Sequence, residues 1–188
     1  MQDHVTATPR LVAAPPKRFP SVLRPASLRA ATRSIMMIGV TTSSTSGIIT
    51  IGYEGRTAED LVGDLVTRGV EVLVDVRLTP ISRKPGLSKS RLSELLSEVG
   101  IAYLHLPALG NPRNNREGFR DGDPGSRTRF ANRLRSGDAE AALDLICDIA
   151  DRSRVALLCY EREATDCHRN LVGRAALRRS PGLVLSHA

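Results

Sequence analysis

The chain has 188 residues, of which 41% are hydrophobic, and it carries a formal net charge of +7 at neutral pH. This length and composition are typical of a globular domain with one hydrophobic core. No run approaches the ~18 consecutive apolar residues of a membrane-spanning helix, so we expect no membrane partner.

The positive charge is concentrated near the start of the chain. Residues 1–46 hold six Lys or Arg residues against one Asp, a net charge of +5, which leaves +2 for residues 47–188. The same segment has five Pro residues and no sustained hydrophobic period. We therefore expect a disordered basic tail, or sequence upstream of the true start, because Met36 and Met37 precede the domain. A nucleic-acid-binding arm and a transit peptide are the alternatives.

The cysteine content bears on the compartment. Cys147, Cys159 and Cys167 are an odd number in a chain without a recognisable secretory signal, which argues against a disulfide framework. We therefore expect a reducing, cytoplasmic location. Cys147 lies in an apolar helical pattern and is expected in the core.

From residue 47 onward, strand and helix signals alternate. Continuous apolar or β-branched runs predict strands at 48–51, 70–76, 101–106, 155–159 and 183–185. Amphipathic patterns with start and stop signals predict helices at 57–68, 88–99, 127–151 and 166–178. The first helix has the clearest boundaries, since Thr57 and Asp60 form a capping-box sequence and Gly69 follows the last turn. The third helix is expected to break at Gly137.

These elements predict an α/β fold in a single domain over residues 47–188. Strands that are apolar throughout are buried on both faces, so the sheet should be mainly parallel, with helices on both faces. The segment 107–127 is predicted to be a long polar loop, because it contains four Gly and three Pro. A loop of this length is expected to be a lid or a border of the site.

Polar side chains follow the ends of the predicted strands. In a parallel sheet these carboxyl ends lie along one edge, where open α/β folds bind ligands. The residues that should converge there are Tyr53, Glu54, Asp75, Arg77, His105, Cys159 and Glu161. The sequence therefore predicts a site at this edge.

The start of the last helix adds further candidates. With Thr165 as the N-cap, Cys167, His168 and Arg169 lie in the first turn, where unpaired N–H groups and the helix dipole favour an anion. The same field would lower the pKa of the Cys167 thiol.

Roles follow from the residue types. Arg77, Arg83 and Arg169 are expected to hold an anion, because a guanidinium binds carboxylate or phosphate through two parallel hydrogen bonds. The candidate catalytic groups are Asp75, Glu161, Cys167 and His168. The other candidate substrate-binding residues are Tyr53, Glu54, His105 and Cys159. In the alternative interpretation, Asp75 and Arg77 only form ion pairs at the sheet edge.

Zinc has candidate ligands in Cys159, Cys167, His168 and His105. The seven-residue gap between the two cysteines and the adjacent Cys-His pair do not match common zinc spacings. We therefore expect no metal and no cofactor.

Four segments in order carry a resemblance to a known family. They are TIGYEGRT from Thr50, VDVRLTPISRKPGLSK from Val74, IAYLHLPALGNPR from Ile101 and CYEREATDCHR from Cys159. Together they resemble the domain of unknown function numbered 488, a bacterial and archaeal family, over roughly residues 49–187. The resemblance implies the fold and the site but supplies no substrate.

Three functions follow from these residues. The leading hypothesis is an enzyme or enzyme-like domain acting on a small anionic or nucleotide-type ligand. The first alternative is a nucleic-acid-binding module. Its phosphate contacts would be Arg83, Lys84, Lys89, Arg91, Arg113 and Arg116. The second alternative makes Cys167 a redox or sulfur-transfer nucleophile, partnered by Cys159 or His168. The sequence does not predict the oligomeric state.

Overall fold

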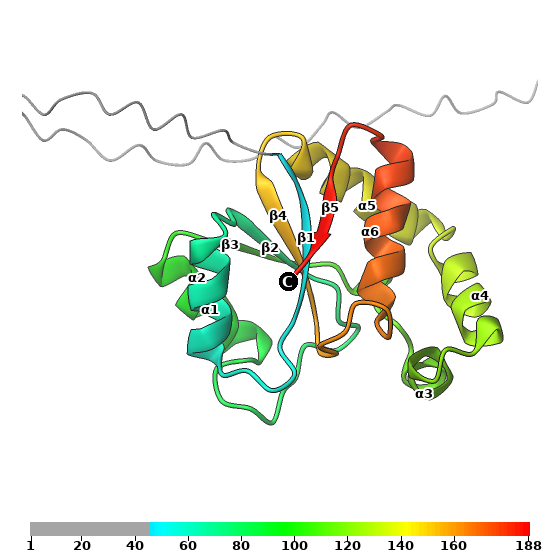
Figure 1. Ribbon diagram of the computed structural model, residues 1–188, viewed down its shortest axis with the longest axis horizontal. Helices are drawn as coiled ribbons and strands as arrows, with labels where there is room; N and C mark the ends of the chain where they lie inside the picture. Colours follow the sequence, from blue (N-terminus) through cyan, green and yellow to red (C-terminus); the bar gives the residue numbers. More distant parts are fainter. Residues whose placement is uncertain (1–45) are drawn as a thin grey trace, which may run out of the picture. The chain divides into compact units, whose positions relative to one another are not determined.

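The computed structural model describes residues 46–188, so the predicted tail, apart from Ser46, lies outside the described residues. Five strands form one sheet: β1 (Gly47–Gly52), β2 (Val72–Asp75), β3 (Ala102–His105), β4 (Arg154–Cys159) and β5 (Leu185–His187). Their order is β3-β2-β4-β1-β5, and every neighbouring pair is parallel (Figure 1). The predicted α/β fold with a parallel sheet is confirmed.

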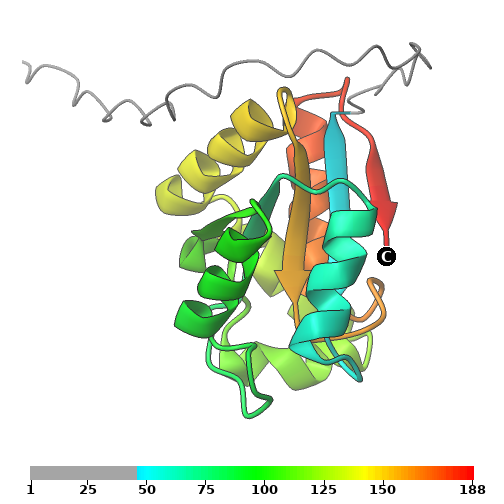
Figure 2. The ribbon, with the colours of Figure 1, turned by 90° about the vertical axis from the view of Figure 1, so that its left-hand side faces the viewer.

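Helices cover both faces of the sheet. Helices α1 (Ala58–Thr67) and α2 (Lys89–Glu98) lie on one face, side by side in Figure 2. Helices α5 (Gly137–Ala150) and α6 (His168–Arg179) lie on the other face, with α4 (Pro124–Arg133) beyond α6. Among the helices of residues 46–188, none has the length and apolar composition needed to cross a membrane.

The internal strands are buried on both faces. In β4, Leu157 packs in the core beneath α5 and α6, while its neighbour Leu158 packs in the core beneath α1 and α2. Both side chains are completely buried. This two-sided burial is the reason that β4 is apolar at consecutive positions.

The path of the chain opens a crevice at one edge of the sheet. Strands β1 and β2 are followed by α1 and α2 on one face, whereas β4, which lies between them, is followed by α6 on the other. Neighbouring strands therefore send the chain to opposite faces. In open α/β sheets, ligands bind at such a switch point, outside the carboxyl ends of the strands.

The boundaries of α1 follow the prediction. Thr57 Oγ1 accepts a hydrogen bond from the backbone N of Asp60 at 3.1 Å, and the Asp60 carboxylate accepts one from the backbone N of Thr57 at 3.1 Å. Gly69 has a φ of +65°, the left-handed conformation that ends many helices. The predicted break of the third helix is also present, because α4 ends at Arg133 and α5 begins at Gly137.

The prediction of a polar loop at 107–127 is wrong in part. This segment contains two 3-10 turns (Pro107–Leu109 and Arg113–Asn115), helix α3 (Arg116–Arg120) and the start of α4. Asp123 caps α4 by accepting hydrogen bonds from two backbone N–H groups. Phe119 of α3 packs edge-to-face on Phe130 of α4, with ring centroids 5.7 Å apart. This contact gives the segment an apolar side that its Gly and Pro content concealed.

Among the other boundaries that differ from the prediction, two lie near the end of the chain. Helix α6 begins at His168 with Cys167 as its N-cap, not Thr165, because Cys167 keeps an extended backbone with φ −119° and ψ 140°. Strand β5 begins at Leu185 rather than Leu183. The carbonyl of Val184 already accepts a hydrogen bond from the backbone N of Ile48, and pairing with β1 continues from there.

Candidate functional site

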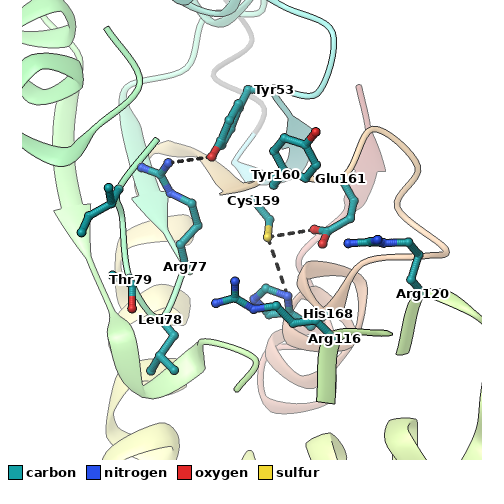
Figure 3. A pocket seen from close by; sticks show the side chains of 11 residues that line it. Tyr53, Arg77, Leu78, Thr79, Arg116, Arg120, Cys159, Tyr160, Glu161 and His168 are labelled. Carbon is teal, nitrogen blue, oxygen red and sulfur yellow. Dashed lines mark hydrogen bonds between the residues drawn. The ribbon is translucent and has the colours of Figure 1, made fainter. Parts of the chain in front are cut away.

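The carboxyl ends of β1, β2 and β4 meet at a pocket with a volume of about 240 Å³ (Figure 3). The parallel register sets Gly52 of β1 beside Cys159 of β4 and Asp75 of β2 beside Leu158 of β4. Residues that follow these strands are therefore brought together. Among the predicted site residues, those that line the pocket are Tyr53, Arg77, Cys159, Glu161 and His168.

Three pocket-lining side chains form a compact group with the buried Cys167, which we call the Cys-Glu-His cluster: Cys159, Glu161, Cys167 and His168. Glu161 Oε2 lies 3.1 Å from the sulfur of Cys159 and 3.1 Å from that of Cys167. His168 Nδ1 lies 3.7 Å from the first sulfur and 3.8 Å from the second. One donor atom from each residue lies within 4.8 Å of all the others, close enough for the group to hold a metal ion.

A backbone contact sets the orientation of the His168 ring. Its Nε2 lies 3.0 Å from the carbonyl oxygen of Val76. Because a carbonyl oxygen can only accept, Nε2 carries the hydrogen, and Nδ1 of the neutral ring is left with a lone pair. Nδ1 is the ring nitrogen that faces the two sulfur atoms. The ring is buried and packs edge-to-face against Phe130, with centroids 5.2 Å apart.

The loop after β4 carries Glu161 into the cluster because three contacts determine its path. Gly52 passes so close to the loop that a Cβ there would collide with the carbonyl oxygen of Glu161. The Arg169 guanidinium donates hydrogen bonds to the carbonyl oxygens of Glu161 and Arg162. Glu54 accepts a hydrogen bond from the backbone N of Arg162 at 3.1 Å. Arg169 and Glu54 therefore hold the loop in place.

The electrostatics of Cys167 differ from the expectation. The side chain is 1% exposed, and burial raises the pKa of the Cys167 thiol well above its ordinary value. The predicted lowering of this pKa by the helix dipole is therefore wrong, because the thiol is enclosed in the core. Burial also opposes the charge of Glu161, but both thiols donate to its carboxylate, and the pKa of Glu161 lies below its usual value.

Asp75 and Arg77 form a buried ion pair at the end of β2. Arg77 Nε lies 2.8 Å and 3.0 Å from the two carboxylate oxygens, and its terminal nitrogens donate to Asp75, Tyr53 Oη and the carbonyl of Leu87. Tyr103 Oη donates to the same carboxylate at 2.6 Å. Burial disfavours the charged guanidinium, but the contact with Asp75 outweighs it and raises the pKa of Arg77. The pair therefore ties the sheet edge together, as in the alternative interpretation.

Other predicted residues lie beside the pocket or away from it. Arg169 is fully buried, and its Nε has no hydrogen-bond partner among residues 46–188. Arg83 is exposed in the loop before α2, and it does not line the pocket. His105 Nε2 lies 2.9 Å from the carbonyl oxygen of Arg77. Glu54 borders a neighbouring hollow. The structure therefore does not bring Arg77, Arg83 and Arg169 together on one ligand.

Two arginines of α3 line the pocket and were not predicted as ligands of a small anion. Arg116 was expected only as a nucleic-acid contact, and Arg120 was not predicted at all. Figure 3 shows both side chains reaching toward the Cys-Glu-His cluster. Their spacing of four residues places them on one side of a helix. That signal is informative only once the segment is known to be helical.

Three of the six residues proposed for nucleic-acid contact line two separate hollows of the surface. Arg116 lines the pocket at the strand ends, whereas Lys84 and Arg91 border a groove beside α1 and α2. Lys84 Nζ donates to the carbonyl of Arg56 at 3.1 Å, and Arg91 pairs with Glu94 at 2.9 Å.

The fold and the site together define an α/β domain with a parallel sheet and a polar pocket at the switch point of its strands. The chain belongs to the family described as Domain of unknown function DUF488, which matches residues 57–176. The resemblance found in the sequence is thus confirmed. No curated protein and no solved structure matches the chain significantly.

Proposed function

We propose that this protein is an enzyme or enzyme-like domain that binds a small anionic ligand, of the phosphate or nucleotide type, in the pocket at the carboxyl edge. The observation that carries the proposal is the pair Arg116 and Arg120. Both guanidinium groups reach into the pocket, and neither forms an ion pair within the part of the chain that the structure describes. Paired arginines with unused N–H donors suit the oxygen atoms of phosphate.

The two arginines are held in different ways. Arg116 Nε donates to the carbonyl of Asn111 at 3.1 Å, which orients the guanidinium and leaves its two terminal nitrogens for a ligand. Arg120 is exposed and makes no hydrogen bond within residues 46–188. Between them Phe119 is 1% exposed and attaches α3 to the domain. The helix therefore presents both charges from a fixed position.

Two tyrosines supply an aromatic wall to the same pocket. Tyr53 and Tyr160 pack edge-to-face, with ring centroids 5.4 Å apart, and both line the pocket (Figure 3). Small-molecule sites combine such apolar surface with a few well-placed polar groups. A ligand with an anionic group and a compact planar or apolar part fits this arrangement.

The reactive groups that face the bound ligand would be those of the Cys-Glu-His cluster that line the pocket. These are the thiol of Cys159, the carboxylate of Glu161 and the imidazole of His168. Asp75 has a different place in this proposal, because its carboxylate is completely buried and bound by Arg77 and Tyr103. We assign Asp75 and Arg77 a positioning role at the pocket wall.

Calorimetric titration with inorganic phosphate and nucleoside mono- and triphosphates tests the binding proposal. Replacing Arg116 or Arg120 with Ala should weaken binding by about tenfold or more, since a hydrogen bond to a charged group contributes ~1.5–3 kcal/mol. Arg135→Ala is the matched control, because this exposed arginine does not line the pocket. Equal binding by all four proteins, or by none, would overturn the proposal.

Product analysis tests the enzymatic part. Each ligand that binds is incubated with the parent protein and examined by mass spectrometry for a chemical change. We expect a product with the parent and with Arg135→Ala, and much less with Arg116→Ala. A ligand that binds through Arg116 but is returned unchanged would leave a binding domain and contradict the enzyme.

A further inference from the structure

The Cys-Glu-His cluster has the composition of a zinc site. It combines two thiols, an imidazole and a carboxylate, all of which are common zinc ligands. The cysteines and the histidine are buried, and Glu161 is half-buried. Soft thiolate ligands together with imidazole favour zinc over the harder cations magnesium and calcium.

Four of the six distances between ligand atoms are close to the edges of a tetrahedral site. With Zn–S bonds of about 2.3 Å and Zn–N bonds of about 2.1 Å, the sulfur–nitrogen edges of a tetrahedron are about 3.6 Å long. His168 Nδ1 lies 3.7 Å and 3.8 Å from the two sulfur atoms. The sulfur–oxygen edges of such a site are about 3.5 Å, and Glu161 Oε2 lies 3.1 Å from each sulfur. A small outward movement of one carboxylate makes room for the ion.

The surroundings orient the ligands before any ion binds. His168 donates its Nε2 hydrogen to the carbonyl of Val76, and this is the backbone contact that metal-binding histidines usually make with their second nitrogen. The contact leaves Nδ1 as the ligand atom. Arg169 holds the backbone of Glu161, so the carboxylate starts from a determined position.

The common zinc spacings, which this sequence does not match, belong to sites whose ligands lie on short loops. Here the ligands come from three kinds of backbone: Cys159 ends β4, Glu161 lies on the loop, and Cys167 caps α6. His168 is the first residue of α6, and its ring turns back toward both cysteines. Adjacent Cys and His residues therefore reach one point despite their unusual order.

From this geometry we propose that Cys159, Glu161, Cys167 and His168 bind a single Zn²⁺ ion, with both cysteines as thiolates. Binding releases the two thiol protons to solvent and involves no change in oxidation state. The inference does not rest on the anion-binding part of the proposed function. In the zinc-bound protein, Cys159, Glu161 and His168 are metal ligands and no longer free reactive groups.

Metal analysis of the full chain, purified from zinc-supplemented cells, is the first test. We expect zinc in equimolar amount in the parent and its loss in Cys159→Ser and Cys167→Ser. Cys147→Ser is the matched control, because Cys147 is also buried but lies on α5, where its thiol contacts the carbonyl of Ala176. Arg116→Ala, used for anion binding, should keep its zinc, so the two proposals can fail separately.

A second test needs no substitution at the site. Zinc is removed from the parent with a chelator and replaced by Co²⁺, whose absorption reports both tetrahedral geometry and thiolate ligands. We expect intense tetrahedral bands with thiolate-to-cobalt charge transfer, and a higher thermal midpoint when zinc is returned. If the purified parent protein contains no zinc and shows none of these bands after cobalt is added, the proposal is overturned. Recovery of a Cys159–Cys167 disulfide in place of zinc would overturn it in favour of a redox pair.

Discussion

The guanidinium of Arg77 and the carboxylate of Asp75 lie against each other in the interior, two residues apart at the end of β2. Their side chains are 5% and 0% exposed, so the ion pair is closed to solvent. The same guanidinium donates hydrogen bonds to the hydroxyl of Tyr53, which follows β1, and to the carbonyl oxygen of Leu87, which precedes α2. One buried pair therefore joins three segments beside the pocket.

Loss of Arg77 should act mainly on stability. In Arg77→Ala the Asp75 carboxylate remains buried without its partner, and breaking a buried pair in this way costs about 3–5 kcal/mol. Urea denaturation measures the change. Arg91→Ala should leave the free energy of unfolding almost unchanged, because the pair of Arg91 with Glu94 is exposed. An Arg77→Ala variant as stable as the parent but unable to bind phosphate would return Arg77 to the ligand site.

Substitution of Gly52 tests the path of the loop that carries Glu161. A Cβ at Gly52 collides with the backbone of Glu161, so Gly52→Ala should lower the free energy of unfolding by about 1–3 kcal/mol and reduce zinc content. Gly63→Ala is the control, since a Cβ there meets open space on helix α1. That change should stabilise the protein by about 0.5–1 kcal/mol. Similar melting of both variants would contradict the close approach.

The ion pairs of Asp64 predict a pH dependence of stability. Partial burial alone would raise its pKa, but hydrogen bonds from Arg56 and Arg68 outweigh this, and the pKa of Asp64 lies below its ordinary value. The stabilisation is therefore complete above the unfolded pKa of about 3.9 and is lost as the pH falls through the folded pKa. Denaturation of the parent and Asp64→Asn from pH 7 downward should show a difference that shrinks in acid. A difference independent of pH would mean that the carboxylate charge is not involved.

Thiol labelling tests the remaining redox alternative. Cys167 is 1% exposed and Cys147 is 6% exposed, so neither sulfur is open to a reagent in the folded protein. We expect iodoacetamide at neutral pH to modify Cys167 no faster than Cys147, and both rapidly only in denaturant. Mass spectrometry of tryptic peptides measures the two rates. Selective, rapid modification of Cys167 in the folded chain would restore it as a nucleophile.

The strands, and the edge of the sheet at which the site lies, could be predicted because they follow from the apolar pattern of short segments. The apolar run at 155–158 is continuous whatever the rest of the fold, and parallel strands bring Tyr53, Arg77 and Cys159 to one edge. The sequence alone did not decide whether Arg77 binds a ligand or pairs with Asp75. Only the side-chain geometry distinguishes a ligand residue from an ion-pair partner, because both interpretations place Asp75 and Arg77 at the end of the same strand.

The features that could not be predicted depend on contacts between distant segments. Helix α3 is stabilised by Phe119 packing on Phe130, and nothing in its five residues marks it as a helix. The role of Arg169 depends on the path of the loop after β4, whose carbonyl groups accept from it. The cluster itself combines residues from β4, this loop and α6, so its distances exist only in the folded chain.

The strand order also bears on how copies of this domain meet. The longest strands, β1 and β4, have six residues each, and both have partners on both sides. The outermost strands, β3 and β5, have only four and three residues. Short edge strands offer few unpaired backbone groups to another chain. Within the described residues, the apolar segments 48–50 and 155–158 thus have a paired strand on both sides, so a second copy cannot add a strand beside them.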